Sequence, residues 1–372
     1  MSDPDDVGAA NRTSSAFNLT SLHARRLLAL AFSFTSVVVA LLGLLEFDVP
    51  ITRFIRSLND YQTDHLHNPW LAQLSELGDR LGKGDSLVEL SLALLVVGYG
   101  FKLSSWKSAG WQTLWSHALA GAGNNILKHL IGRARPKFMH AGNAEYAPLS
   151  GSGWDSFPSG HSMASFAVAS VLAVRFPRMR WIIMPLALAV AASRVVRGSH
   201  YLTDVVAGAV LGFWIGMVAA HPWRDWRSSL ESALFLTSPV VVALLAFVWT
   251  VGYRFRGLWA SEILVNGGLV VALAAVLIHG MLTARAEIIP GWLTGPVLEG
   301  LMGFGIGCFS GSVVVASTVL LACLAHWIRP RAEHALTGSS SFLVWLREGA
   351  IVLGTLGALF AMAELRGVLP ML

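Results

Sequence analysis

The sequence predicts an all-α integral membrane protein with about ten membrane-spanning helices. Of its 372 residues, 54% are hydrophobic and only 13% are charged, whereas soluble domains carry about 25% charged residues. The mean hydropathy is +0.59, and several apolar runs approach the roughly 20 residues that a helix needs to cross the hydrocarbon core. These observations exclude an ordinary soluble domain.

The formal net charge of +5 does not require a nucleic-acid partner. Most Lys and Arg residues stand in short loops between apolar runs, where anchoring at the membrane surface accounts for them. We therefore expect the bilayer, and no nucleic acid, as the partner of these charges.

Residues 1–26 predict a polar cytoplasmic tail. They begin with acidic residues and end in Arg25-Arg26, directly before an apolar run. A cleaved signal peptide would carry its positive charge nearer the start and a small-residue cleavage site after the run. The segment Leu45–Asp48 is no such site, so we expect a first span that stays attached.

Six apolar runs follow the tail, with a more polar connection at residues 46–85 after the first of them. Apolar residues of this connection, such as Ile51, Phe54 and Ile55, recur at helical spacing, so we expect an amphipathic helix on the membrane surface here. The six predicted spans are about 27–45, 87–103, 111–131, 159–174, 181–196 and 201–220.

A polar, basic linker at residues 221–232 separates these spans from residues 233–372, where we recognise no motif. The glycine-rich run 300–327 is long for one span, which indicates close helix packing or a broken helix. The four further spans predicted in this region are about 234–252, 263–282, 300–327 and 350–362.

Three dense polar clusters stand at ends of the predicted spans. The third span ends in one cluster, the fourth begins in the next, and the fifth and sixth are joined by the last. The third span ends and the fourth begins on the same side, and the fourth and fifth spans together cross the membrane twice. Segment parity therefore brings all three clusters to one membrane surface. The clusters are Lys128–Pro136, Ser156–His161 and Ser193–Asp204.

The cations of these clusters predict a site for a multiply charged oxyanion. Lys128, Arg135 and Arg194 would repel one another unless an anion lay between them. The Ser159-Gly160 turn opens a helix, and a helix N-terminus is itself an anion site. Arginine matches the oxygen geometry of phosphate, and lysine adds a point charge. Phosphate is therefore the first candidate.

The two histidines of the clusters can divide the chemistry. His200 and Asp204 are four residues apart, so they share a helix face, where the carboxylate can fix the imidazole tautomer and leave one nitrogen as a nucleophile. His161 suits protonation of a leaving oxygen. The neighbouring His129, Arg133 and Arg197 lie off these patterns, and contact with a substrate head group is open for each. The spacings predict no metal site.

At this point the residues resemble the type-2 phosphatidic acid phosphatase (PAP2) superfamily, in its bacterial membrane lipid phosphatase branch. The three signatures of that family, Lys-x6-Arg-Pro, Pro-Ser-Gly-His and Ser-Arg-x5-His-x3-Asp, are complete in this sequence and in the same order. The resemblance implies a six-span helical core over residues 27–220 and a reaction through a phosphohistidine without metal or cofactor. It implies His200 as nucleophile, oriented by Asp204, with His161 as general acid, and phosphoryl binding by Lys128, Arg135, Ser159, Gly160 and Arg194.

We therefore expect hydrolysis of phosphate monoesters or pyrophosphates of membrane lipids. The candidate substrates are phosphatidic acid, phosphatidylglycerophosphate, isoprenyl pyrophosphate and lipid A. A lipid phosphotransferase using the same intermediate remains an alternative, and so does a lipid or anion transporter or flippase. The resemblance implies a bacterial inner membrane, and the positive-inside tendency favours a site that faces the periplasm or exterior. The oligomeric state stays open.

Overall fold

The computed structural model describes residues 4–58, 69–138, 145–151, 153–256, 260–285, 295–329 and 341–366. Within these ranges every element of regular secondary structure is a helix, apart from one isolated β-bridge between Arg133 and Tyr146. This confirms the predicted all-α class. The chain divides into two compact units, one of residues 41–237 and one of residues 1–40 with 238–372.

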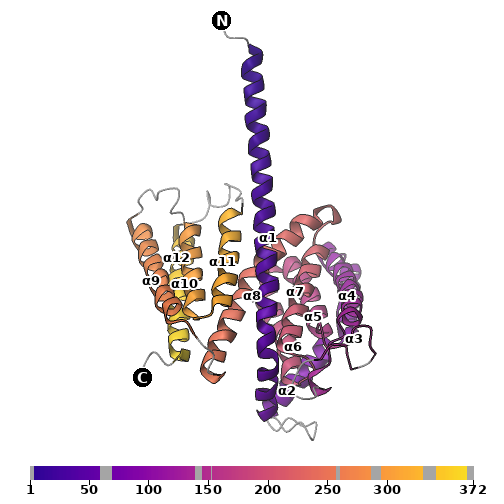
Figure 1. The fold of residues 1–372 in the computed structure, drawn as a ribbon. Helices are drawn as coiled ribbons and strands as arrows, with labels where there is room; N and C mark the ends of the chain where they lie inside the picture. Colours follow the sequence, from indigo (N-terminus) through magenta and orange to yellow (C-terminus); the bar gives the residue numbers. More distant parts are fainter. Residues whose placement is uncertain are drawn as a thin grey trace. The chain divides into compact units, whose positions relative to one another are not determined.

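The unit of residues 41–237 holds the three polar clusters. The helix of the first span covers residues 4–58 and is much longer than the predicted 27–45. The other five predicted spans agree with helices of this unit within a few residues, except that one helix begins at Ser104 rather than near Trp111. The helices are the second part of α1 (Pro4–Leu58), α2 (Pro69–Gly82), α3 (Gly84–Gly100), α4 (Ser104–Ile131), α5 (Gly160–Arg175), α6 (Arg180–Val196), α7 (Leu202–Ala219) and the start of α8 (Trp226–Arg256) (Figure 1).

The connection after the first span differs from the prediction. Residues 51–58 continue α1 as its last turns, past Pro50, and do not form a separate surface helix. The amphipathic helix of this connection is α2, which packs on α6 with Gly78 against the side chain of Ser193. A membrane helix can contain a proline such as Pro50, because neighbouring groups can donate a hydrogen bond to the carbonyl that proline leaves unbonded.

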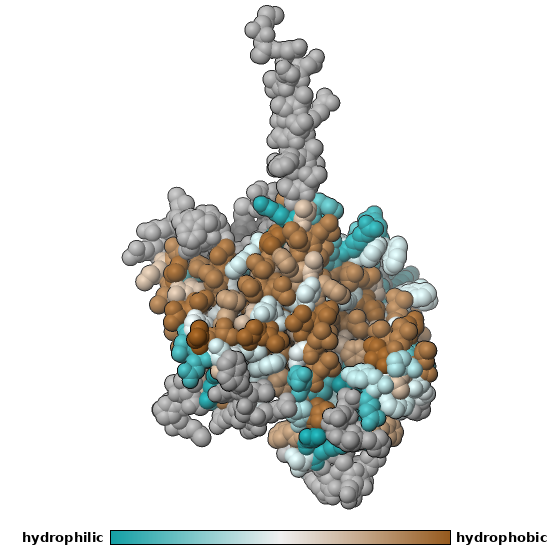
Figure 2. All heavy atoms as spheres, in the orientation of Figure 1, coloured by the Kyte–Doolittle hydropathy of each residue, from teal (hydrophilic) through white to brown (hydrophobic). Residues whose placement is uncertain are grey.

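Five helical segments in the described part of the chain are long and apolar enough to cross a membrane. Figure 2 shows hydrophobic side chains on the flanks of the helices, with hydrophilic ones gathered toward helix ends. The protein is therefore an integral membrane protein. The five segments are Leu22–Ser57, Pro177–Val196, Leu202–Ala219, Trp223–Gly252 and Glu262–Leu282.

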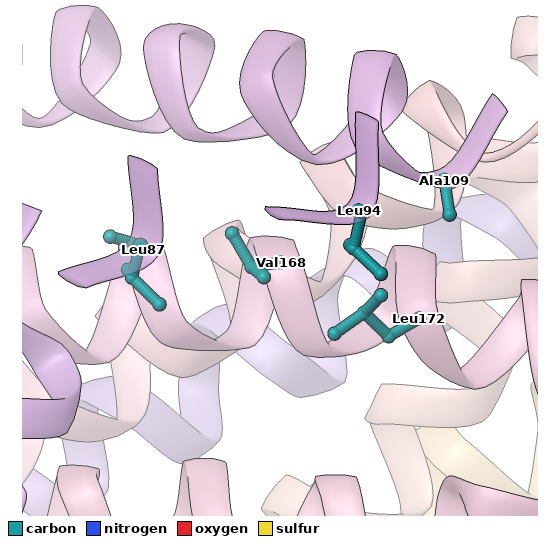
Figure 3. Close-up of a cluster of buried hydrophobic side chains, with 6 residues drawn as sticks. Leu87, Leu94, Ala109, Val168 and Leu172 are labelled. Atoms are coloured by element: carbon teal, nitrogen blue, oxygen red, sulfur yellow. The ribbon is translucent and has the colours of Figure 1, made fainter. Parts of the chain in front are cut away.

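Helix α5 is the centre of its unit. It packs against α4, α6 and α7, and the side chains from Ser162 to Leu172 are almost all buried. On one side, Val168 and Leu172 meet Leu87 and Leu94 of α3 in an apolar cluster (Figure 3). This packing holds the start of α5 in a fixed place among its neighbours.

Glycines at every fourth position of α7 bring its backbone close to that of α5. A Cβ atom on Gly208, Gly212 or Gly216 would come within 2.6, 2.1 and 2.3 Å, respectively, of a backbone carbonyl oxygen at the start of α5 or within it. Only glycine fits such an approach, which is common between membrane helices. The starts of α5 and α7 therefore touch, and the Ser159 amide donates a 3.0 Å hydrogen bond to the Asp204 carbonyl.

The other unit contains the remaining helices. The glycine-rich run predicted as one long span is broken at residues 310–312, where Gly311 takes a left-handed backbone conformation (φ +75°) and Ser312 caps the next helix. Both alternatives for this run are observed, because a Cβ atom on Gly305 would also come 2.6 Å from the backbone nitrogen of Ala272 on the neighbouring helix. Besides the first part of α1 and most of α8, the helices of this unit are α9 (Glu262–Arg285), α10 (Gly295–Phe309), α11 (Val313–Ile328) and α12 (Ser341–Arg366).

Candidate functional site

The three polar clusters meet where α4 and α6 end and where α5 and α7 begin. Helix α4 ends at Gly132, whose left-handed conformation (φ +60°) turns the chain back beside its own last turn. A side chain there would strike the Ala147 carbonyl at 2.0 Å. The turn directs the segment with Arg133 and Arg135 toward the starts of α5 and α7. The two arginines are two positions apart in the sequence, but they bind different carboxylates.

Arg133 forms a fully buried ion-pair network beneath the site. Its two terminal nitrogens donate to Asp204 Oδ1 at 2.6 Å and to Asp48 Oδ2 at 2.8 Å. The three residues are 1%, 0% and 1% exposed. Asp48 also accepts from the amide and hydroxyl of Thr203, and the guanidinium lies over the Tyr201 ring. Contact of Arg133 with a substrate head group is thereby excluded, because its charge is buried and paired.

His200 is held with one ring nitrogen facing a backbone carbonyl. Its Nδ1 lies 2.8 Å from the Ser156 carbonyl oxygen and 3.8 Å from Asp204 Oδ2. Because a carbonyl only accepts, Nδ1 carries the proton and Nε2 keeps its lone pair. Asp204 instead accepts from the Ser156 hydroxyl at 2.5 Å and the Tyr201 amide at 2.9 Å. The carboxylate therefore orients the imidazole partly through Ser156.

Burial also keeps the His200 imidazole neutral. The ring is 3% exposed, and burial lowers the pKa of His200 below its ordinary 6.5, more than the nearby Asp204 carboxylate raises it. The positive charges of Arg135 and Arg194 act in the same direction as burial. A neutral ring with a free Nε2 lone pair is the form that can act as a nucleophile.

Asp155 lies outside the predicted site, and its carboxylate pairs with two of the side chains predicted to bind phosphate. Arg135 donates to both of its oxygens, at 2.8 and 2.6 Å, and Lys128 Nζ lies 3.7 Å away. The hydrogen bonds from Arg135 lower the pKa of Asp155 despite partial burial. A signal for it exists in the sequence, because Asp155 is the only acidic residue between Glu145 and Asp204.

A second carboxylate, Asp79 of α2, pairs with further cationic side chains of the site. Arg194 donates to it at 2.6 Å, Arg197 lies at 3.2 Å, and His161 Nε2 lies 3.5 Å from Oδ1. Burial alone would raise the pKa of Asp79, but the hydrogen bond and charge of Arg194, with the charge of Arg197, lower it. His161, which lacks a carboxylate beside it in the sequence, thus receives one from another helix.

The Ser159-Gly160 turn opens α5 beside these groups. Ser159 is fully buried, and its side chain does not cap the helix; instead it accepts a 3.0 Å hydrogen bond from the Ser162 hydroxyl. The first amides of α5 are therefore left to an anion. A Cβ atom on Gly160 would come 3.0 Å from the Asn124 amide nitrogen, so glycine keeps this helix end open.

The arrangement can bind an oxyanion by exchange. Asp155 and Asp79 neutralise three predicted phosphate-binding cations, and His161 Nε2 is buried without a hydrogen-bond partner among the described residues. These groups lie close enough for their charges to interact, because His161 has electrostatic interactions with Arg194, Lys128 and His200. A phosphoryl group entering beside His200 would replace carboxylate oxygens with its own.

The part of the chain that carries the three clusters is similar to known proteins. The PAP2 superfamily matches residues 109–228, which contain all three signatures. Lipid A 1-phosphatase of Rhizobium etli is 34% identical over 203 residues, covering 50% of this chain and 82% of the relative.

Two further relatives align over similar lengths. The protein of the same name from Rhizobium johnstonii is 38% identical over 165 residues, which cover 40% of this chain and 68% of the relative. Phosphatidylglycerophosphatase B of Bacillus subtilis is 32% identical over 158 residues, which cover 40% of this chain and 72% of the relative. Since each alignment covers more than two thirds of the relative, the chain belongs to the PAP2 superfamily.

Proposed function

We propose that the protein removes a terminal phosphate from a membrane lipid through a phosphohistidine on His200. The chain is a hydrolase of phosphoric monoesters or pyrophosphates, as its family and its phosphatase relatives show. The observation that carries the mechanism is the buried His200 ring, whose Nδ1 is fixed on the Ser156 carbonyl, so that Nε2 is left for the substrate.

The proposed reaction has two steps. His200 Nε2 attacks phosphorus while the bond from phosphorus to the lipid oxygen breaks, and His161 donates a proton to that leaving oxygen. Water then attacks the phosphohistidine, His161 takes a proton from it, and inorganic phosphate leaves. Lys128, Arg135 and Arg194, with the first amides of α5 at Ser159-Gly160, stabilise the charge on the phosphoryl oxygens.

The lipid substrate is supported by the setting and by the relatives. The site lies at the end of membrane helices, and the relatives are named for lipid A and phosphatidylglycerophosphate. We propose that residues 27–220 form a six-span phosphatase domain, followed by the basic linker 221–232 and about four further helices in residues 233–372.

The function is tested by offering the purified full chain phosphatidic acid, phosphatidylglycerophosphate, isoprenyl pyrophosphate and lipid A. We expect phosphate release from at least one of them, unchanged by a chelator. Loss of activity in the chelator would contradict the metal-independent mechanism. Transfer of labelled phosphate to a second lipid rather than to water would favour the phosphotransferase alternative.

We also propose that the site faces the exterior of the inner membrane. The opposite ends of the same helices carry the basic groups, and Arg175 at the end of α5 bonds Gln112 of α4 and the Ala220 carbonyl after α7. The positive-inside tendency places these ends in the cytoplasm. A water-soluble short-chain lipid phosphate should then be hydrolysed by sealed right-side-out vesicles; equal hydrolysis by inside-out vesicles would overturn the orientation.

The carboxylate of Asp79 should compete with the phosphoryl group. Asp79→Asn is expected to tighten inhibition by inorganic phosphate about tenfold, because a charge-assisted hydrogen bond worth about 1.5 kcal/mol or more no longer opposes binding. The inhibition constant of the variant measures this. Glu76→Gln is the matched control, since Glu76 lies one turn earlier on α2 and pairs with exposed Arg80. An unchanged constant in Asp79→Asn would contradict the exchange.

A further inference from the structure

An apolar cavity lies between α2, α3, α5 and α6. Its volume is about 390 Å³, and every lining side chain except that of Ser165 is apolar, including Trp106 at the start of α4. Four of the lining side chains, Leu87, Leu94, Val168 and Leu172, are drawn in Figure 3, where those of α3 face those of α5. The shape and lining suit a hydrocarbon chain.

The cavity begins at the candidate site. Leu81, at one end of the lining, lies two residues after Asp79 on α2. A Cβ atom on Gly82 would come 2.5 Å from Val190, another lining residue, and 2.9 Å from the His161 ring. The lining therefore reaches the imidazole proposed to protonate the leaving oxygen.

From there the cavity follows α5 away from the site. Lining residues run from Ser165 to Phe176, which is about 16 Å at 1.5 Å per residue. A chain attached to a head group at His161 could thus extend along α5, away from the site and into the bilayer.

Ser165 is the unusual member of this lining. Its side-chain oxygen is buried and has no hydrogen-bond partner among the described residues, although the residue is only 5% exposed. Several other hydroxyls within the helices of this unit bond back to the carbonyl four residues earlier, as those of Ser91, Thr113 and Ser170 do. An unpaired buried hydroxyl costs free energy unless a ligand supplies the partner.

We propose that this cavity holds an acyl chain of the substrate and that Ser165 donates a hydrogen bond to the ester or amide oxygen joining that chain to the head group. The inference rests on the proposed function. Ser165 lies one helical turn, about 6 Å, beyond His161. An acylated glycerol or sugar phosphate has such an oxygen a few bonds from its leaving oxygen, whereas an isoprenyl pyrophosphate has none.

The test compares substrates with and without that oxygen in the purified full chain. Ser165→Ala is expected to lower kcat/KM about tenfold for phosphatidic acid, lipid A or both, whichever the wild type hydrolyses, and to leave isoprenyl pyrophosphate unchanged. The ratio between the two acylated substrates distinguishes a glycerol from a sugar head group. Ser170→Ala is the matched control on α5, because its hydroxyl is already bonded to the Phe166 carbonyl.

A second variant tests the chain itself. Ala169→Phe fills the cavity and should lower kcat/KM for long-chain phosphatidic acid more than for its short-chain analogue. Equal losses on all substrates in both variants, or no loss in either, would overturn the inference. If wild-type protein releases phosphate from no lipid, the proposed function fails instead, so the two failures are distinguishable.

Discussion

Replacing His200 with alanine is expected to lower kcat on lipid phosphates by on the order of 10⁴-fold or more, because the reaction loses the atom that forms the covalent intermediate. The ring is buried and bonded to the Ser156 carbonyl, so few other groups can reach the phosphorus in its place. Steady-state phosphate release measures the loss. Quenching in alkaline detergent shortly after labelled substrate is added should leave label on the wild type and none on the variant, because a phosphohistidine survives in base and hydrolyses in acid.

The control for this variant is another histidine at the same end of the helix bundle. His129 lies one residue after Lys128, and its Nδ1 is bonded to the Asn125 carbonyl on an exposed face of α4. His129→Ala should keep activity within a factor of a few. Retention of wild-type activity in His200→Ala, with normal thermal unfolding, would remove His200 from the mechanism.

The pH profile gives a second measurement of the same group. Only the neutral ring is nucleophilic, so kcat/KM should fall as pH drops through the pKa of His200 in the free enzyme. Because burial lowers that pKa, the midpoint of the acid limb is expected below the ordinary 6.5. A limb centred at or above 6.5 would show that the titrating group is another one.

Much of the helical framework could be predicted from the sequence, because the apolar runs of α4 to α7 begin or end at dense polar clusters. Parity of crossings was enough to place the clusters at one surface. The amphipathic helix expected within residues 46–85 exists as α2, but the apolar positions named for it belong to the end of α1, since residues 51–58 and α2 share the same apolar spacing and only tertiary packing separates them.

The partners of the site residues could not be predicted from local patterns. Asp79 lies 115 residues from Arg194, on a helix that carries no family signature. Arg133 and Arg135 stand two residues apart with the same side chain, yet one is buried between two carboxylates and the other faces Asp155. The turn at Gly132 determines where each of the two side chains lies, and the spacing of the residues alone does not predict the direction of that turn.

Arg133→Ala is expected to be the most destabilising substitution in this unit. Removing the guanidinium leaves Asp48 and Asp204 buried together without their shared cation, and breaking a buried pair in this way costs about 3–5 kcal/mol. For a unit of this size the loss should lower Tm by on the order of 10 °C. Thermal unfolding of the purified protein in detergent measures it.

The same change should also reduce activity in the fraction that stays folded. Arg133 holds Asp204, Asp204 holds the Ser156 hydroxyl, and the Ser156 carbonyl holds the His200 ring. Arg133→Lys keeps the charge but not the two-pronged geometry, so it should fall between wild type and alanine. Arg80→Ala breaks only an exposed pair with Glu76, worth about 1 kcal/mol at most. If Arg133→Ala unfolds no earlier than Arg80→Ala, the buried network does not hold the site together.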